Sequence, residues 1–321
     1  MMKMSIQYSR RAVMKRMTAM LLAMQLVLCG CGTVQTQQVK DAKTICVVLK
    51  AMNSVHWMAV ESGLEQAASD FGVSVNILYP QSESDCRAQK VMIADAIASK
   101  PDAIAVAPCD ANEMDILQQA DQNGVRAFYI DSSSTKYDCP YIGSDNYRIG
   151  ELAAKKIASH LNTGKIAVIS GSLQQSTHYE RVQGFRDYME QHTKLEVCAV
   201  QENPDSGEIE SMKSMQRLLE EHPDVKGVFC TSAMMVLGAM RQRDREERTD
   251  ILLIGVDTQS DALLAVEQGE ILAIVGQDGY QIGYKTIQTI ADALDGKDID
   301  DAVFVENDLI TQDNVKKYLS H

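Results

Sequence analysis

The sequence predicts an α/β fold made of two doubly wound parallel-sheet lobes. Short apolar runs alternate with segments whose apolar residues recur at three- and four-residue spacing, and this alternation occurs in two successive series. Strands and helices by turns are typical of parallel βαβ units. The two series also begin alike, which suggests two lobes of one architecture.

The first series starts at the apolar run 45–49, which is typical of a strand buried on both faces. The next segment carries Trp57, Val60 and Leu64 at helical spacing and stops at Gly72. After it we expect strands at 73–77, 103–107 and 125–130 and helices at 85–99 and 111–123.

The second series has expected strands at 165–169, 195–200, 225–230, 251–256 and 271–275, separated by helices, the first at 177–191. In each series the first helix opens with a histidine and an aromatic residue and has a glycine in its second turn. The opening pairs are His56-Trp57 and His178-Tyr179, and the glycines are Gly63 and Gly184.

The first 30 residues have the composition of a cleaved export signal. Basic residues such as Lys3 and Arg10 precede an apolar run from Thr18 to Leu28, and no acidic residue occurs. The run is shorter than the about 20 apolar residues that a membrane-spanning helix needs. We interpret residues 1–30 as a signal peptide, and the pair Arg10-Arg11 leaves both the Sec and the twin-arginine export routes open.

Cys31 is the expected lipid-attachment site. Leu28-Cys29-Gly30-Cys31 resembles the lipobox of bacterial lipoproteins, whose cysteine carries acyl chains such as palmitate. Cys29 fits that pattern less well, because bulky Leu28 would stand where a small residue belongs. Residues 31–43 are polar without an apolar period, so we expect a flexible tether.

The chain is strongly acidic, with 31 Lys+Arg against 44 Asp+Glu and a formal net charge of −13. Loss of residues 1–30, which hold five basic residues and no acidic one, leaves −18. Such a chain repels phosphate backbones, which argues against nucleic-acid binding.

Six cysteines follow Cys31, and none of them forms a CxxC pair of the kind that suggests a metal or redox site. Cys46, Cys198 and Cys230 lie in apolar runs and are interpreted as small buried hydrophobic residues. A disulfide among Cys86, Cys109 and Cys139, near expected loops or helix ends, is left open.

Polar side chains follow the expected strands, at the edge where open parallel sheets bind ligands. These positions are Lys50, Cys109-Asp110, Asp131-Ser132, Ser170-Gly171-Ser172, Thr231-Ser232, Asp257-Thr258 and Gln277-Asp278. Carboxylates accept strong charge-assisted hydrogen bonds from hydroxyls, and an aromatic face suits the C–H side of a sugar. No nucleophile with a paired base stands out, so we expect a binding protein for a polyhydroxylated solute, not an enzyme, with no metal or cofactor.

Several candidate ligand-binding residues also have a purely structural interpretation. Asp131 and Asp257 could be helix N-caps, Trp57 could be a core residue, and Lys50 could be a solvated lysine at a strand end. His56 is more often a surface or capping residue than a ligand contact.

Several motifs, in order, resemble the type I periplasmic binding proteins, specifically the ribose- and galactose-binding branch of the solute-binding proteins of sugar ABC transporters. They are VVLKAMNSVHWMAVESGLEQAASDFGV, DAIAVAP, YID, YIGSDNYRIGELAA, STHYERVQGF, HPDVKGVF, LIGVD and VGQD. The resemblance runs from about Thr44 to Leu319. It implies a type I periplasmic-binding-protein fold, in which two lobes joined by three crossovers enclose the ligand.

The resemblance also implies boundaries. The crossovers are expected near 144–146, 277–279 and 305–308. The N-terminal lobe would comprise 44–144 plus 279–305, and the C-terminal lobe 145–278 plus 306–321.

The family's ligand-binding acids match Asp131 and Asp257, and its ligand amide at a crossover matches Gln277. A polar crossover group matches Ser144, and an aromatic pair of the ribose binders matches His56-Trp57. The implied ligand-binding set is Lys50, His56, Trp57, Asp131, Ser144, Tyr179, Arg181, Ser232, Asp257 and Gln277.

The chain departs from the ribose binders at several positions, so ribose itself is not the expected ligand. Ser132 and Tyr179 stand where ribose binders have arginines, Ser232 replaces an asparagine, and Ser206 replaces a cleft aromatic residue. Lys50 is similar to the lysine of autoinducer-2-binding and rhamnose-type relatives, and it also admits an anionic ligand such as a sugar acid.

The expected function is capture of a sugar or polyol by a monomeric extracytoplasmic lipoprotein that delivers it to an ABC permease. The alternative is a sensor that presents a sugar or autoinducer-2-type signal to a membrane kinase or chemoreceptor, and the sequence does not separate the two. A LacI-type repressor would carry a helix-turn-helix where this chain has its signal peptide. A glycosidase using Asp131 and Asp257 is disfavoured, because the two would sit on opposite lobes. Attachment at the cell surface or in the periplasm depends on whether the host has one membrane or two.

Overall fold

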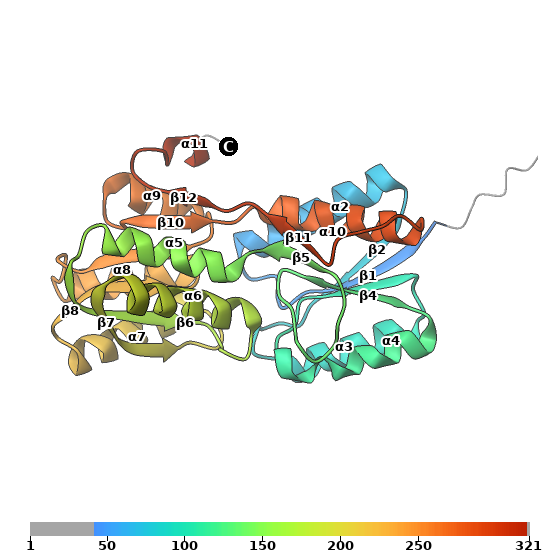
Figure 1. Cartoon of the computed structure of the whole chain (residues 1–321), viewed down its shortest axis with the longest axis horizontal. Coiled ribbons are helices and arrows are strands. Elements are labelled where there is room, and N and C mark those ends of the chain that lie inside the picture. The colour runs from blue at the N-terminus through green and yellow to red at the C-terminus, as the bar shows by residue number, and fades with distance from the viewer. Residues whose placement is uncertain (1–41, 320–321) are drawn as a thin grey trace, which may run out of the picture. The chain divides into compact units, whose positions relative to one another are not determined.

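The computed structural model describes residues 42–319, which contain two six-stranded sheets flanked by helices (Figure 1). Cys31, the expected signal peptide and most of the expected tether lie outside the described residues. None of the helices within 42–319 is long and apolar enough to cross a membrane.

The first sheet has the strand order β11-β5-β4-β3-β1-β2, and every pairing in it is parallel. Its strands are β1 (Thr44–Val48), β2 (Ser74–Leu78), β3 (Ala103–Val106), β4 (Arg126–Ile130), β5 (Tyr141–Ser144) and β11 (Ala302–Val305). The intervening helices are α2 (Val55–Phe71), α3 (Cys86–Ala98), the 3₁₀ helix η1 (Ala111–Leu117) and α4 (Gln118–Asn123). We call this part the N-lobe.

The second sheet repeats this order as β12-β10-β9-β8-β6-β7, except that β12 is antiparallel to β10. Its strands are β6 (Thr163–Ser170), β7 (Lys194–Glu202), β8 (Val225–Cys230), β9 (Leu252–Val256), β10 (Ala273–Gly276) and β12 (Asp308–Ile310). With it go α5 (Asn146–Ala158), α6 (Ser176–His192), α7 (Glu208–Glu221), α8 (Ala233–Arg245), α9 (Ser260–Gln268) and α11 (Lys316–Leu319). We call this part the C-lobe. Helix α10 (Gly279–Leu294) packs against α2 of the N-lobe.

Both sheets are buried on their two faces, which is why their strands read as continuous apolar runs. In β1, Ile45 and Val47 enter the core beneath α2 and α10, while Cys46 and Val48 enter the core beneath α3. The second sheet divides its strand residues between two cores in the same way. The predicted two-lobed α/β fold is therefore confirmed.

The expectations differ from the structure in two respects. The segment 111–123, expected as one helix, is a 3₁₀ helix followed by a short α-helix, because Glu113 has non-helical backbone angles. The short strands β5, β11 and β12 were not expected, because three or four residues carry too little apolar pattern to stand out.

Three short links connect the lobes, and one side chain ties them together. They are Asp145 between β5 and α5, Gln277-Asp278 between β10 and α10, and Glu306-Asn307 between β11 and β12. The amide of Asn307 donates to Ser144 Oγ at 3.0 Å and to the Gly276 carbonyl at 3.3 Å. The third link is thus bonded to the residues that directly precede the other two.

Glycines let two helix pairs cross at backbone contact, one pair in each lobe. In the N-lobe, a Cβ at Gly63 of α2 would overlap the Tyr280 carbonyl oxygen of α10, and one at Gly283 would overlap the Val60 carbonyl. In the C-lobe, Gly150 of α5 faces the Arg181 carbonyl of α6 in the same manner. Gly184 of α6 likewise faces the Tyr147 carbonyl of α5, so Gly63 and Gly184, paired in the sequence, mark equivalent helix crossings.

We expect Gly63→Ala to lower the free energy of unfolding by about 2 kcal/mol or more, because its methyl group would push two helix backbones apart. The matched control is Gly207→Ala, since Gly207 has an ordinary φ of −79° and open space around its Cβ position. Urea unfolding of both variants measures the difference. Equal stability of the two variants would contradict the close crossing.

Candidate functional site

A cavity of about 280 Å³ lies between the carboxyl-end edges of the two sheets. Its walls come from loops after β1, β2, β4, β7, β8 and β9, from the starts of α2 and α6, and from the link after β10. This is where open parallel sheets bind ligands. Most of the expected ligand-binding residues line it: Lys50, His56, Trp57, Asp131, Arg181, Ser232, Asp257 and Gln277.

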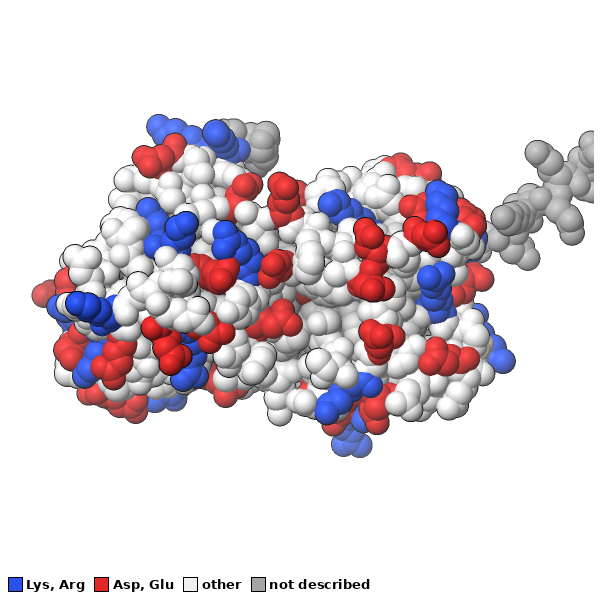
Figure 2. Space-filling model, viewed as in Figure 1, with Lys and Arg blue, Asp and Glu red and all other residues white. Residues whose placement is uncertain are grey.

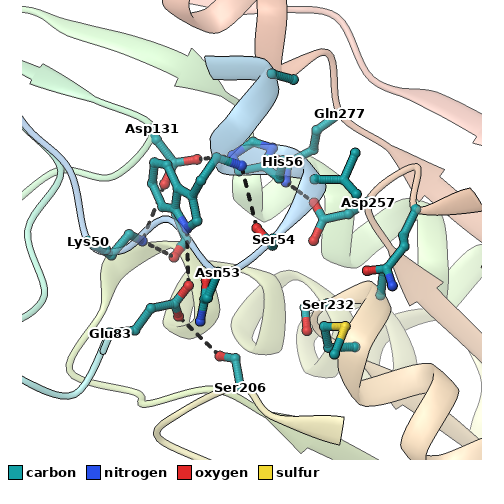
Figure 3. A pocket seen from close by; sticks show the side chains of 18 of the residues that line it. Lys50, Asn53, Ser54, His56, Glu83, Asp131, Ser206, Ser232, Asp257 and Gln277 are labelled. Atoms are coloured by element: carbon teal, nitrogen blue, oxygen red, sulfur yellow. Dashed lines mark hydrogen bonds and ion pairs between the residues drawn. The ribbon is translucent and has the colours of Figure 1, made fainter. Parts of the chain in front are cut away.

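Asp131 lies in the N-lobe wall of the cavity, where its carboxylate contacts a lysine and a histidine. Its Oδ2 lies 3.2 Å from Lys50 Nζ, and its Oδ1 lies 2.8 Å from His56 Nε2 (Figure 3). Burial alone would raise the pKa of this carboxyl, but Lys50, His56 and Arg181 together hold the pKa well below its ordinary value. Asp131 is therefore an ionised hydrogen-bond acceptor. Its interpretation as a helix N-cap is wrong, because β4 is followed by β5 and not by a helix.

Lys50 is buried, with 2% of its surface exposed, so it is not a solvated strand-end lysine. Besides Asp131, its ammonium donates to Gln175 Oε1 at 3.2 Å and to Thr177 Oγ1 at 3.3 Å, both in the C-lobe. A lysine has three N–H donors. All three are matched by protein acceptors, so Lys50 bridges the lobes and has no donor to spare for a ligand anion.

Asp257 occupies the C-lobe wall, and Figure 3 shows it across the cavity from Asp131 with His56 between them. Its Oδ1 accepts a hydrogen bond from Gln277 Nε2 at 2.6 Å, and its other carboxylate oxygen has no hydrogen-bond partner among residues 42–319. The N-cap residue of the following helix is Gln259, so Asp257 is not a helix cap either.

Both aspartates have left-handed backbone angles, with φ of 63° at Asp131 and 76° at Asp257. Residues other than glycine rarely adopt such angles, and they tend to cluster at functional sites. Asp131 and Asp257 follow equivalent strands, β4 and β9. In both, a left-handed backbone conformation directs the carboxylate into the cavity.

Trp57 serves the core and the cavity at once. It belongs to the N-lobe core and also lines the cavity, and its Nε1 donates to Glu83 Oε1 at 3.1 Å. His56 packs edge-on against the indole at 5.1 Å between ring centroids. Burial would lower the pKa of His56, but Asp131 and Asp257 raise it above its ordinary value.

Arg181 brings unused donors to the cavity. Its Nε donates to Asn146 Oδ1 at 2.9 Å and its Nη1 to the Thr231 carbonyl at 2.8 Å. A guanidinium has five N–H donors, so the remaining ones are free to meet a ligand oxygen. Ser232 also lines the cavity, although its Oγ already accepts from the Met235 amide and caps α8.

Two expected residues do not line the cavity. Tyr179 is half exposed on α6, because His178 and Arg181 occupy the inward face of that helix. Ser144 is buried at the end of β5, where its hydroxyl accepts from Asn307. The structure therefore does not bring either of them to the site.

Glu83 was missed by the sequence reasoning. It lies in the loop after β2 and accepts from Trp57 and, across the cleft, from Ser206 Oγ at 3.2 Å (Figure 3). The neighbouring Asp205 of the C-lobe accepts from Ser82 at 2.7 Å and from Ser84. Glu83 does not directly follow β2, which ends at Leu78, so its approach to the cavity depends on the path of the loop.

No group of three or more histidine, cysteine or acidic side chains within 42–319 has the arrangement to hold a metal ion. The surface shown in Figure 2 carries interspersed acidic and basic side chains without a continuous basic area. The site is thus built for hydrogen bonding, with carboxylates in the majority among its charged groups.

His178 lies buried at the C-lobe wall beside Gly171, and its Nδ1 is 2.8 Å from Thr231 Oγ1. Burial, with Arg181 and Lys50 nearby, holds the pKa of His178 well below its ordinary value. The folded chain therefore keeps this ring neutral at a pH where the unfolded chain protonates it.

We expect this histidine to reduce stability on acidification. Below about pH 6.5 the unfolded state binds one more proton than the folded state, so the free energy of unfolding falls by up to about 1.4 kcal/mol per pH unit. His178→Gln should lose this component of the decline between pH 7 and pH 5 in urea unfolding. The exposed His160→Gln should keep it, and identical slopes for both variants would refute the assignment.

The chain resembles known proteins over nearly its whole length. Residues 45–298 match the family model described as the periplasmic binding protein domain. The ribose import binding protein RbsB of Bacillus subtilis is 29% identical over 310 residues, 93% of this chain and all of that protein.

Solved structures agree with this. A carbohydrate transporter solute-binding protein from Agrobacterium radiobacter, in complex with D-arabinose, superposes with a TM-score of 0.81 at 25% identity, over 88% of this chain and 100% of that chain. An ABC transporter solute-binding protein from Agrobacterium vitis with bound D-fucose also reaches 0.81, at 27% identity over 85% and 97% of the two chains.

Proposed function

The chain belongs to the periplasmic binding protein domain family, and on this basis we propose that it captures a neutral monosaccharide or polyol between its lobes and delivers it to an ABC permease. The observation that carries the proposal is the pair Asp131 and Asp257, which face one cavity from opposite lobes. Relatives whose names or titles specify ribose, arabinose or fucose support a sugar as the ligand.

The charges in the cavity favour a neutral ligand over a sugar acid. Its lining includes four carboxylates, Asp131, Asp257, Glu83 and Asp205, against the two permanent cations Lys50 and Arg181. Because Lys50 is already matched by protein acceptors, an added carboxylate would meet net negative charge. Ligand hydroxyl groups, in contrast, donate readily to carboxylate oxygens.

The size of the cavity favours a small solute. Its volume of about 280 Å³ lies just below the range of about 300–1,000 Å³ that is usual for small-molecule sites. Trp57 provides an aromatic surface on one side, and Arg181 provides donors for ring or hydroxyl oxygens. This combination suits one monosaccharide better than a longer chain of sugars.

Capture then depends on lobe closure. Lys50 bonds to Gln175 and Thr177, and Glu83 bonds to Ser206, so the N-lobe and C-lobe are already joined across the cleft. A ligand favours the closed state only by interacting better with it than with the open state. A sugar held by both Asp131 and Asp257 does so. We assign no catalytic role to Asp131, because a carboxyl with so low a pKa is a poor proton donor.

A thermal-shift screen tests the ligand class, with D-ribose, D-allose, D-arabinose and D-fucose against D-gluconate and D-galacturonate. We expect at least one neutral sugar to raise Tm, since a ligand at 100 times its Kd stabilises by about 2.7 kcal/mol. Sugar acids should have no effect. A response to the acids alone would overturn the neutral-ligand proposal.

The double variant Asp131→Ala, Asp257→Ala should lose the Tm increase produced by the responding sugar, because each lobe then lacks its acceptor. Asp250→Ala is the matched control, since Asp250 is exposed and pairs with Arg248 at 2.8 Å, outside the cavity lining. An undiminished increase in the double variant would sink the site assignment, even if the ligand class were correct.

We also propose that Cys31 is acylated and tethers the protein to the outer face of a membrane. Expression in a bacterium followed by fractionation tests this. Cys31→Ser should move the protein from the membrane to the soluble fraction, whereas Cys29→Ser should leave it membrane-bound. The reverse pattern would place the lipid on Cys29, and membrane retention of both variants would contradict a lipid anchor at either cysteine.

A further inference from the structure

Two thiols meet on the cleft side of the N-lobe, outside the cavity that holds Asp131. Cys86 is the first residue of α3, and Cys109 follows β3. Both line a second hollow, whose other wall is formed by C-lobe residues: Ser172, Leu173, Gln174, Glu202 and Pro204. Cys109 is buried and Cys86 is partly exposed.

Gln89 fixes the approach of the two cysteines. It lies one turn beyond Cys86 on the same face of α3, and it is almost completely buried. Its Nε2 donates to the carbonyl oxygens of Leu49 at 3.0 Å and Ala107 at 2.8 Å, and its Oε1 accepts from the Cys109 amide at 2.8 Å. This bonding holds the start of α3 against the segment that carries Cys109, so the two cysteines lie on the same hollow.

The two thiols differ in reactivity. The neighbouring Cys109 lowers the pKa of Cys86 against the effects of burial and of Asp110, whereas the neighbouring Cys86 and burial raise the pKa of Cys109. Burial raises the pKa of Cys46 to about 11 despite its hydrogen bond with Asn76. A thiolate is the form that attacks disulfides, so Cys86 is placed to react first.

Cys139 does not compete for this partnership. Burial and the charges of Asp138 and Asp121 raise its pKa, and Cys139 does not line the hollow that holds Cys86 and Cys109. The six described cysteines are all unbonded thiols in the structure. Among the three that the sequence left open, the geometry selects Cys86 and Cys109.

We propose that Cys86 and Cys109 form a dithiol–disulfide pair, a redox modification site on the cleft side of the N-lobe. The oxidant is an external disulfide, from a small thiol or an oxidoreductase. The Cys86 thiolate attacks one sulfur of that disulfide, forms a mixed disulfide and releases the first thiol. Cys109 then loses its proton and displaces the second thiol, so two protons and two electrons end on the reduced oxidant.

The bond would close the segment 86–109 into a ring next to the contacts between the lobes. Ser82 and Ser84, just before α3, both donate to Asp205 of the C-lobe. Cross-linking the start of α3 to Cys109 restricts the base of this loop. The disulfide also stabilises the folded state, because it removes loop entropy from the unfolded chain.

The experiment treats the full reduced chain with oxidised glutathione, alkylates the remaining thiols and maps the peptides by mass spectrometry. We expect a linked Cys86–Cys109 peptide and a rise in Tm of about 5 °C or more. Cys198→Ser, a variant at a partly exposed cysteine of the C-lobe, should retain both effects. Cys86→Ser and Cys109→Ser should lose both.

Three results would overturn the proposal. They are full alkylation of both thiols after oxidation, a linked peptide that contains Cys139, and glutathione retained on Cys86 without a link to Cys109. If a serine variant fails to fold, the presence or absence of the linked Cys86–Cys109 peptide in the unsubstituted chain and in Cys198→Ser still tests the proposal. None of these readouts uses a sugar, so they stand or fall separately from the proposed ligand.

Discussion

The arrangement of the site depends on the contact between two helix backbones in each lobe. Gly63 and Gly283 let α2 lie directly on α10, and the α5–α6 crossing uses Gly150 and Gly184 in the same way. One member of each pair carries ligand-facing side chains at its start, and the other begins at an interlobe link. The distance between cavity wall and link is therefore set by backbone contact, with no side chain in between whose rotamer could change it.

The charges buried at the site are stabilised by partners from both lobes. Isolating a carboxylate from water is costly unless charged and hydrogen-bonding partners surround it. Asp131 meets this condition through Lys50 and His56, and Lys50 through acceptors of the other lobe. Removing Lys50 would leave the buried charge of Asp131 with one partner fewer. Lys50 therefore stabilises this charge and also holds the two lobes together. Asp257, with one oxygen unclaimed, is the more available acceptor.

Much of the fold could be predicted because strands buried on both faces and amphipathic helices leave strong periodic patterns. The site was predictable where strand ends carry unusual residue types, as at Lys50, Asp131 and Asp257. The direction in which individual side chains point could not be predicted. Tyr179 follows His178 directly, and a shift of one residue on a helix turns the side chain by about 100°. Glu83 depended on a loop path that no periodicity encodes, and Ser144 has the right position in the chain but is occupied by Asn307.

The amide of Asn307 has a mechanical consequence. Three chain segments pass between the lobes within the reach of this one side chain, so they act together as a fulcrum and not as three separate tethers. Two bodies joined at nearly one place can tilt and twist but cannot slide past each other, because sliding would stretch links of one or two residues. The cavity lies beside that fulcrum, with Gln277 on a link itself, and Figure 3 shows Glu83 on the opposite side of the cavity from Gln277. A tilt about the links therefore moves the Glu83 side further than the Gln277 side. Because Gln277 both lines the cavity and belongs to a link, a solute that contacts it acts directly on the segment about which the lobes tilt.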